Sequence, residues 1–480
     1  MRQQDSPWCS SACCKSRWAP AWPDDACQAD SFDVDHRIHG TRDRWQPESR
    51  RRPVACGQRG RGRRAAEDGP RRRHEGGSGV KREVVEREIV VPGFRFGGVV
   101  AGVKKSGLPD CGIIVADRPA AVGAVFTRNT FCAAPVVVGR QRVQGGSLQA
   151  VVVNSGNANA CTGRQGLADA RSMCALAGRA LGVAPRLVAP SSTGMIGVEL
   201  PMERLGPGIA RAAADATPDG LWRFARAIMT TDAFPKVARA TARIGGKVVN
   251  VAGIGKGAGM IAPDMATLLV YVVTDAAVDR RTAARLAREV AARPFNELTV
   301  DGDSSTNDSL FLLAGGAAGN ATITGDGAAR KALARAVGAV ASEIARQVAL
   351  DGEGATKAVR ILVRGAASDR DAERIVRAVG GSQLVKTAFF GADPNWGRIA
   401  CAVGYSGVAV DPARVSIRIG EIEVFRRGAG IATAREQARA VMAESEFDVT
   451  IAIGRGKGKA RLLSSDLSKD YVDLNSAYST

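Results

Sequence analysis

The sequence is poor in histidine, and this shortage narrows the chemistry that the chain can perform. Its 480 residues include only three histidines, His36, His39 and His74, all of which lie in an arginine-rich leader. Histidine is the usual base in acyl transfer, because its unperturbed pKa of about 6.5 allows proton exchange near neutral pH. Any nucleophilic catalysis after the leader must therefore use a different base.

Aromatic residues, long apolar runs and closely spaced cysteines are scarce as well. Aromatics make up 5% of the chain and glycine reaches 56 residues, which predicts an aliphatic core with many tight turns. No run of about 18 apolar residues occurs, so we expect no membrane-spanning helix. The cysteines after the leader lack zinc-type spacing. We therefore expect free thiols in a reducing cytoplasm. No metal or bound cofactor is implied.

The formal net charge of +19 raises the question of a nucleic-acid partner. The basic residues are scattered along the chain and are not interleaved with aromatics, so a solvated surface without nucleic-acid binding is the preferred interpretation. A basic scaffold or nucleic-acid-binding protein is the alternative from a different class. It predicts salt-dependent binding to polyanions by an uncut chain.

Residues 1–83 differ in character from the rest of the chain. They lack hydrophobic periodicity, have no apolar stretch for a secretory signal, and carry too many acidic residues for a transit peptide. Two interpretations remain open: a disordered leader, or an extension upstream of a true start near Val80. From Val84 onward, short Val/Ile-rich segments alternate with Ala-rich ones, which predicts a layered α/β fold.

Apolar periodicity also places individual elements along this second part of the chain. We expect helices near residues 165–180, 202–214, 221–229, 281–292, 328–349, 369–379 and 432–444. We expect strands at 150–153, 247–252, 268–273, 310–313, 359–363, 415–419, 422–424 and 449–453, with the 415–419 and 422–424 strands joined as a hairpin.

The most informative dipeptide is Ala266-Thr267, near the end of the segment 256–267. A threonine that becomes a chain N-terminus carries its own base, an α-amine with a pKa of about 8. The glycine-rich residues 253–259 lack P-loop spacing, so a phosphate site is not expected. We expect instead that their backbone closely approaches a substrate or Thr267, with Lys256 supplying positive charge. Cysteines 111, 132 and 161 have no partner histidine and are weaker candidates for the nucleophile.

Three further segments carry polar groups that could serve a site. Residues 191–197 predict a hydroxyl-rich turn whose backbone N–H groups could face an oxyanion. Residues 301–308 resemble a calcium loop, but Leu312 stands where a bidentate Glu is required, so a turn network is expected. Residues 351–357 place Glu353 on a flexible loop, or form an ordinary helix-to-strand connection.

Taken together, these segments resemble the glutamate N-acetyltransferase (ornithine acetyltransferase) family of arginine biosynthesis. The resemblance covers roughly Pro92 to Thr480 and leaves only the leader outside. It is carried by residues 102–110, 154–159, 192–197, 229–232, 256–267, 299–308, 391–398 and 471–480.

The resemblance implies a fold and a reaction. The fold is an α/β/β/α-type sandwich with a smaller C-terminal α/β domain. The precursor cleaves its own Ala266–Thr267 bond, giving an α fragment of residues 84–266 and a β fragment of residues 267–480. The freed Thr267 attacks the acetyl group of N2-acetylornithine, releases ornithine and passes the acetyl group to glutamate. Acetyl-CoA is a further candidate donor.

The same resemblance implies roles for particular residues and an assembly. Thr193 and Gly194 correspond to the oxyanion-hole pair. The substrate-contacting positions are Thr230, Lys256, Thr267, Glu353, Asn475 and Thr480. Lys256 suits a substrate α-carboxylate and Glu353 suits its cationic end. The family also implies an assembly of two α and two β fragments. An N-terminal-nucleophile amidohydrolase or aminopeptidase, with water as the final acceptor, is the alternative that would use the same nucleophile.

Overall fold

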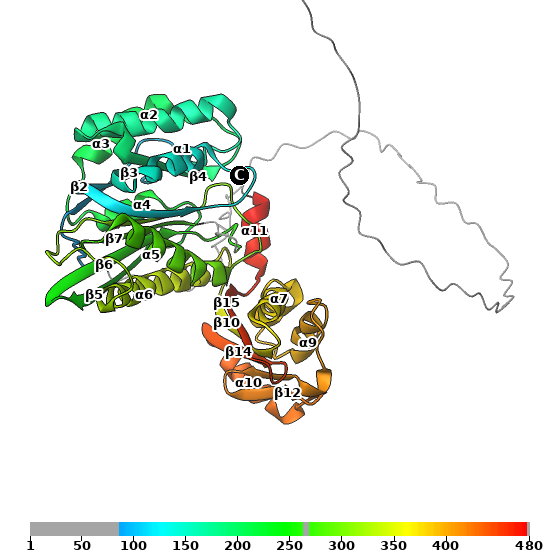
Figure 1. The fold of residues 1–480 in the computed structure, drawn as a ribbon. Helices are drawn as coiled ribbons and strands as arrows, with labels where there is room; N and C mark the ends of the chain where they lie inside the picture. Colours follow the sequence, from blue (N-terminus) through cyan, green and yellow to red (C-terminus); the bar gives the residue numbers. More distant parts are fainter. Residues whose placement is uncertain (1–85, 263–267, 478–480) are drawn as a thin grey trace, which may run out of the picture. The chain divides into compact units, whose positions relative to one another are not determined.

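The structure, a computed structural model, describes residues 86–262 and 268–477 (Figure 1). The predicted leader lies outside the described residues. The same holds for the predicted cleavage bond between Ala266 and Thr267, and for Thr480.

The larger of the two sheets has the strand order β4-β3-β2-β9-β7-β6-β5, with β1 paired to β2. The β3–β4 and β7–β9 pairs are parallel, and the other neighbours are antiparallel. The strands are β1 Phe94–Val99, β2 Cys111–Phe126, β3 Ser147–Asn157, β4 Val188–Met195, β5 Lys236–Ile244, β6 Lys247–Lys256, β7 Leu269–Thr274 and β9 Ser309–Ala314.

The long strand β2 belongs to two leaves of this sheet. Its register against β3 shifts between Val115 and Ala120, and its second half pairs with β9. One apolar core contains side chains from both leaves, such as Val151 of β3 with Tyr271 of β7 and Phe311 of β9. The rings of Tyr271 and Phe311 stack, with centroids 6.0 Å apart. The two leaves therefore face each other across a shared core.

Helices cover the outer side of each leaf (Figure 1). Helices α1, α2 and α3 pack on the β2–β3–β4 leaf, and α5 and α6 pack on the other. Their bounds are α1 Ala134–Arg142, α2 Gly163–Leu181, α3 Met202–Ala214, α4 Leu221–Ala227, α5 Arg280–Ala292 and α6 Ala328–Leu350. The predicted α/β/β/α layering is confirmed.

A second sheet forms the predicted smaller C-terminal part. Its order is β13-β12-β11-β14-β10-β15-β8, and one face packs against helices around a separate core. The elements are β8 Leu298–Thr299, β10 Ala358–Ala366, α7 Asp369–Gly380, α8 Gln383–Phe390, α9 Trp396–Gly404, β11 Ser416–Ile419, β12 Ile422–Arg426, β13 Ala429–Gly430, α10 Arg435–Met442, β14 Glu446–Ala452, β15 Gly458–Ser465 and α11 Lys469–Ala477. Short 3-10 helices lie at Val143–Gly145, Pro185–Leu187, Phe295–Glu297, Pro412–Arg414 and Ala432–Ala434.

Two local predictions were wrong. The hydroxyl-rich segment is not a turn, because β4 continues through it to Met195. The glycine-rich segment was expected to follow a strand, but β6 runs on to Lys256 and includes Gly253 and Gly255. A side chain at Gly253 would meet Val340 of α6, so the missing side chains allow this helix to pack closely on the strand.

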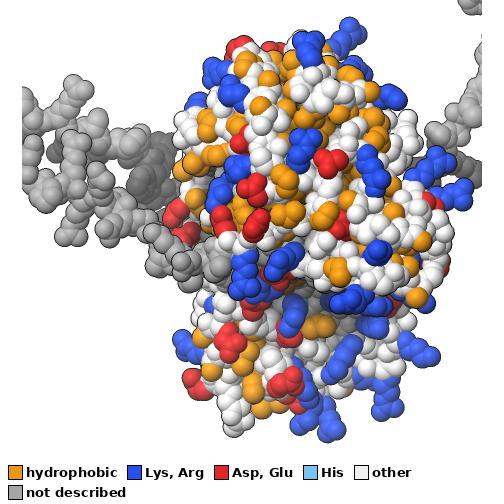
Figure 2. Space-filling model, turned by 90° about the vertical axis from the view of Figure 1, so that its left-hand side faces the viewer, with side chains coloured by type: hydrophobic (Ala, Val, Ile, Leu, Met, Phe, Trp, Pro, Cys, Tyr) orange, Lys and Arg blue, Asp and Glu red, His pale blue; other side chains and the backbone are white. Residues whose placement is uncertain are grey.

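The surface carries mixed charge. Figure 2 shows basic side chains interspersed with acidic ones over the visible face. Many arginines pair with acids, including Arg346 with Glu446 and Arg360 with Asp448. Within the described ranges, no helix combines the length and the apolar character that a membrane crossing requires.

Candidate functional site

One small cavity gathers predicted site residues from distant parts of the chain. It has a volume of about 100 Å³ and lies at the ends of β4 and β6. The predicted residues that line it are Thr193, Gly194, Thr230, Lys256, Glu353 and Asn475. Thr231, the neighbour of Thr230, lines it as well. The remaining predicted site residues, Ala266, Thr267 and Thr480, lie outside the described part of the chain.

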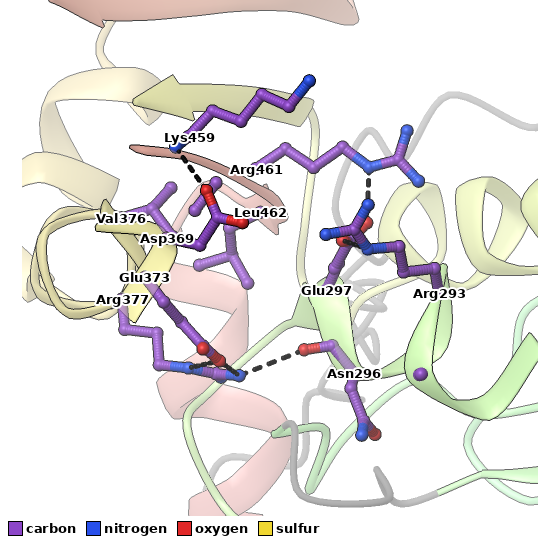
Figure 3. A pocket seen from close by; sticks show the side chains of 12 residues that line it. Arg293, Asn296, Glu297, Asp369, Glu373, Val376, Arg377, Lys459, Arg461 and Leu462 are labelled. Carbon is purple, nitrogen blue, oxygen red and sulfur yellow. Dashed lines mark hydrogen bonds and ion pairs between the residues drawn. The ribbon is translucent and has the colours of Figure 1, made fainter. Parts of the chain in front are cut away.

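A larger cavity of about 500 Å³ lies elsewhere, beside α7 and β15 (Figure 3). Its arginines are already paired: Arg293 and Arg461 contact Glu297, and Arg377 contacts Glu373. None of the predicted site residues lines it. Size alone therefore does not identify the site, and the smaller cavity is the candidate.

Lys256 supplies the positive charge of the candidate site. It is the last residue of β6 and is only 5% exposed. Its Nζ donates a hydrogen bond of 3.3 Å to Thr193 Oγ1 and lies 3.9 Å from Asp232 Oδ2. Burial lowers the pKa of this ammonium below its usual value, and the Asp232 carboxylate opposes the shift. Asp232 therefore helps to keep Lys256 charged.

The end of β4 requires glycine at position 194. Gly194 has a φ of +127°, and a Cβ there would lie 2.6 Å from the backbone N of Asn157. The backbone two residues earlier is also held, because Asn307 Nδ2 donates to the Ser192 carbonyl at 2.8 Å and to the Ala158 carbonyl at 2.6 Å. Thr193 and Gly194 are thus presented to the cavity by a fixed backbone, as an oxyanion hole requires.

Glu353 supplies the negative charge on another wall. Its backbone N–H donates to the Ala258 carbonyl at 2.9 Å, and its Oε2 accepts a 2.9 Å hydrogen bond from Asn475 Nδ2 of α11. The carboxylate lies so close to Gly259 that a Cβ there would come within 2.5 Å of Oε1. The cavity therefore presents an ammonium and a carboxylate on different elements.

Asp308 is a buried acid that was not among the predicted site residues. This residue begins the approach to β9, is 1% exposed, and neither carboxyl oxygen forms a well-aligned hydrogen bond with any described residue. Burial raises its pKa well above the usual range, and the Leu268 backbone and Lys256 oppose this shift. The sequence gives no sign that Asp308 is buried, because it ends a segment in which the other aspartates are typical of turns.

The aspartate network predicted for residues 301–308 is present in part. Asp301 accepts hydrogen bonds from the backbone N–H groups of Met260 at 2.6 Å and Ile261 at 2.8 Å, and from its near neighbour Asp303 at 3.2 Å. These bonds hold the chain just before residues 263–267. In the part of the chain that the structure describes, no group of three or more His, Cys, Asp or Glu side chains is placed to hold a metal.

Comparison with known proteins gives the family. A family profile described as the ArgJ family matches residues 95–480. The arginine biosynthesis bifunctional protein ArgJ of Symbiobacterium thermophilum is 47% identical over 390 residues, covering 81% of this chain and 97% of its own length. The protein of the same name from Geobacter sulfurreducens is 47% identical over 393 residues, covering 81% and 100%.

A solved structure, described as ornithine acetyltransferase from Mycobacterium tuberculosis complexed with ornithine, is 38% identical. It covers 36% of this chain and 93% of that one, with a TM-score of 0.33. The family assignment depends on the sequence matches, which extend over most of this chain and nearly all of each relative. The chain therefore belongs to the ArgJ family and is an acyltransferase of arginine biosynthesis.

Proposed function

We propose that this chain cleaves its own Ala266–Thr267 bond and then transfers acetyl from N2-acetylornithine to glutamate through an acetyl ester on Thr267. Acetyl-CoA is a second proposed donor. One observation carries the proposal. In a chain of the ArgJ family, the fixed Thr193–Gly194 backbone, the buried Lys256 ammonium and the Glu353 carboxylate line the same cavity.

The charges in the cavity match those of the proposed substrate. Lys256 would pair with the α-carboxylate, and Glu353 with the cationic end of the ornithine side chain. Because Lys256 is almost fully buried, its attraction for a carboxylate is screened less than it would be at the surface. Asn475 already donates to Glu353, which holds that carboxylate in place before substrate arrives.

The chemical step needs a base and a site for the oxyanion. The α-amine of Thr267 takes the proton from its own hydroxyl, and the hydroxyl oxygen forms a bond to the acetyl carbon. The tetrahedral oxyanion lies against Thr193 and Gly194. Its collapse breaks the bond to the ornithine nitrogen, which leaves with the proton. Glutamate then attacks the acetyl ester through the same steps in reverse.

Lys256 has a second use in this step. Its Nζ donates to Thr193 Oγ1, so that oxygen serves as an acceptor and its own hydrogen is free to donate. That hydrogen is then available to the oxyanion. Loss of one such donor typically costs roughly 100-fold or more in rate. Thr193→Val should therefore lower kcat by about that factor, whereas Thr193→Ser should retain most of it.

The proposed assembly contains two copies each of residues 84–266 and 267–480. Within one copy, strands from the two fragments would be joined along the β2–β9 and β6–β7 pairs. Native mass measurement of the purified protein tests the stoichiometry, and a mass corresponding to one copy of each fragment would rule it out.

Intact mass and N-terminal sequencing of the purified protein, beside a Thr267→Ala variant, test the proposal directly. The expected result is a fragment that begins Thr-Leu-Leu-Val in the wild type and an uncut chain in the variant. An assay with N2-acetylornithine should then give ornithine and, only when glutamate is present, N-acetylglutamate. An uncut chain that still transfers acetyl would remove the α-amine from the mechanism. Release of free acetate in place of N-acetylglutamate would point to a hydrolase.

A further inference from the structure

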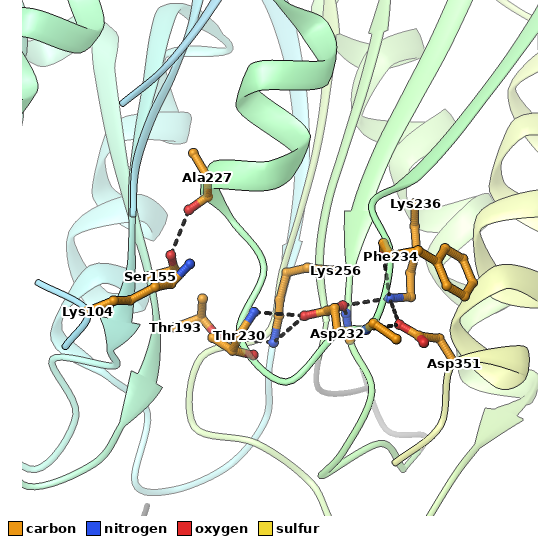
Figure 4. A network of polar contacts seen from close by, with 12 residues as sticks. Lys104, Ser155, Thr193, Ala227, Thr230, Asp232, Phe234, Lys236, Lys256 and Asp351 are labelled. Atoms are coloured by element: carbon orange, nitrogen blue, oxygen red, sulfur yellow. Dashed lines mark hydrogen bonds and ion pairs between the residues drawn. The ribbon is translucent and has the colours of Figure 1, made fainter. Parts of the chain in front are cut away.

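A buried lysine outside the substrate-contacting set joins two carboxylates behind the cavity (Figure 4). The Nζ of Lys236, the first residue of β5, lies 2.6 Å from Asp232 Oδ1 and 2.5 Å from Asp351 Oδ2. The side chains of Lys236 and Asp232 are 0% exposed, and that of Asp351 is 6% exposed. These three residues form a buried ion triad.

Each carboxylate of the triad also accepts hydrogen bonds from backbone N–H groups, and one of these groups, at Thr230, belongs to the cavity lining. Asp232 accepts from the N–H of Thr230 at 2.9 Å and from the N–H of Gly257 at 2.7 Å, directly after Lys256. Asp351 accepts from the N–H of Ala233 at 3.0 Å. Asp351 occupies the C-cap position of α6, two residues before Glu353. The triad therefore links the backbone next to Lys256 with the backbone next to Glu353.

Fold stability is a weak explanation for such a triad. Removing charges from water costs several kcal/mol per ion, and well-packed apolar replacements of buried ion pairs are often as stable. Hydrogen bonds to fixed backbone groups instead provide geometric definition. The triad suits a site in which two charged groups, here the Lys256 ammonium and the Glu353 carboxylate, must be held at a fixed separation.

We propose that Lys236, Asp232 and Asp351 form a positioning clamp that sets the separation and charge balance of Lys256 and Glu353. The clamp would thereby select α-amino-acid substrates whose cationic side chain has the length of ornithine. This inference rests on the proposed function, in which Lys256 and Glu353 contact the two ends of the substrate. None of the three clamp residues touches the reacting atoms, so they are positioning residues.

The clamp makes a charge prediction that a purely structural triad does not make. The charged groups that face Lys256 are Asp232, Lys236, Glu353, Asp308 and, from the segment before β2, Lys104. In Asp351→Asn, the charge of Lys236 is less neutralised, so the Lys256 ammonium loses its proton at lower pH. In the double variant Lys236→Met/Asp351→Asn, the positive charge of Lys236 no longer opposes that of Lys256, and the Lys256 ammonium keeps its proton to higher pH.

The test measures kcat/KM against pH for the acetylation half-reaction with N2-acetylornithine. The basic limb of the profile should move to lower pH in Asp351→Asn and to higher pH in the double variant. Val348→Ala is the matched control, because it removes buried volume from the same end of α6 without changing charge. It should leave the limb in place, even if the protein is less stable.

A second readout is the selectivity between N2-acetylornithine and N2-acetyllysine, which differ by one methylene. A difference of one methylene is typically worth about 10-fold or more in kcat/KM. Asp351→Asn should reduce the wild-type preference several-fold, and Val348→Ala should not. The clamp would be overturned if the basic limbs of the two variants stay in place or move in the same direction. It would also be overturned if the preference for N2-acetylornithine is unchanged in Asp351→Asn, or if both clamp variants fail to fold.

The activity of the wild-type protein shows whether the clamp proposal alone has failed or the proposed function has failed as well. A wild type that transfers acetyl normally, beside variants without the expected shifts, overturns the clamp alone. A wild type that takes no acetyl from N2-acetylornithine overturns the proposed function, and the clamp with it.

Discussion

Replacing Gly259 with alanine should disable Glu353 without changing that residue. A Cβ at Gly259 would lie 2.5 Å from Glu353 Oε1, well inside van der Waals contact. The obstructed group is the end of a flexible side chain, so the carboxylate can swing away while the backbone stays in place. The movement would break the 2.9 Å hydrogen bond from Asn475 and remove the negative charge from the cavity wall.

The size of the effect follows from the contact that is lost. A hydrogen bond to a charged group contributes about 1.5–3 kcal/mol, or roughly 10- to 150-fold in an equilibrium or rate constant. Glu353 is partly exposed, so the lower half of this range applies. The kcat/KM for N2-acetylornithine should fall about 10-fold, and Glu353→Gln should show a similar loss.

Steady-state kinetics of both half-reactions measure this effect. The loss should fall on the ornithine half-reaction, because glutamate has no cationic side chain for Glu353 to bind. Gly338→Ala is the matched control, since a Cβ at this position in α6 meets nothing within 4 Å. It should leave kcat/KM unchanged. An ornithine half-reaction that survives Gly259→Ala, or an equal loss with glutamate, would refute the assignment of Glu353 to the cationic end.

Three other changes have defined outcomes. Tyr271→Phe removes a buried hydroxyl that forms no well-aligned hydrogen bond with the described residues, so denaturant unfolding should show no loss beyond about 1 kcal/mol; a larger loss would reveal a bond, with Ser191 the nearby candidate. Burial raises the pKa of Asp308 in the folded protein. The free energy of unfolding of the wild type should therefore fall, relative to that of Asp308→Asn, as pH rises from about 4 through that raised pKa; parallel profiles of unfolding free energy against pH would contradict this. A tag fused after Thr480 should lower activity more than an N-terminal tag, because α11 brings Asn475 to Glu353; equal activities would argue against it.

Much of the layered fold could be predicted from local pattern, because its helices carry one apolar face. Helix α3 occupies the predicted residues, Met202–Ala214, and α7 differs from its prediction by one residue at its end. Strand β2 was not predicted because Arg118 and Pro119 interrupt its alternation. The structure accommodates the proline where the register against β3 shifts, a position at which a strand can lack a hydrogen-bond donor.

The candidate site also has a part that could be predicted from the sequence and a part that could not. The cavity-lining residues lie in short segments of glycine and hydroxyl residues that the sequence makes recognisable. The triad behind them was not recognisable, because Lys236 and Asp351 are 115 residues apart and each resembles an ordinary surface charge. No local pattern encodes a pairing that forms only when α6 packs against β5 and β6. Burial, which gives these charges their effect, is a property of the folded chain.

The strand order of the larger sheet has a consequence if the chain cleaves itself as proposed. The sheet runs β2-β9-β7-β6, so two strands from residues 267–480 lie between strands from residues 84–266. A cut before β7 would leave these strands hydrogen-bonded on both sides, and the two pieces would stay together. Once melted, however, they would have to find each other again in solution. Refolding of the cut protein would then be second-order, and its melting temperature would rise with protein concentration, unlike that of the uncut Thr267→Ala chain.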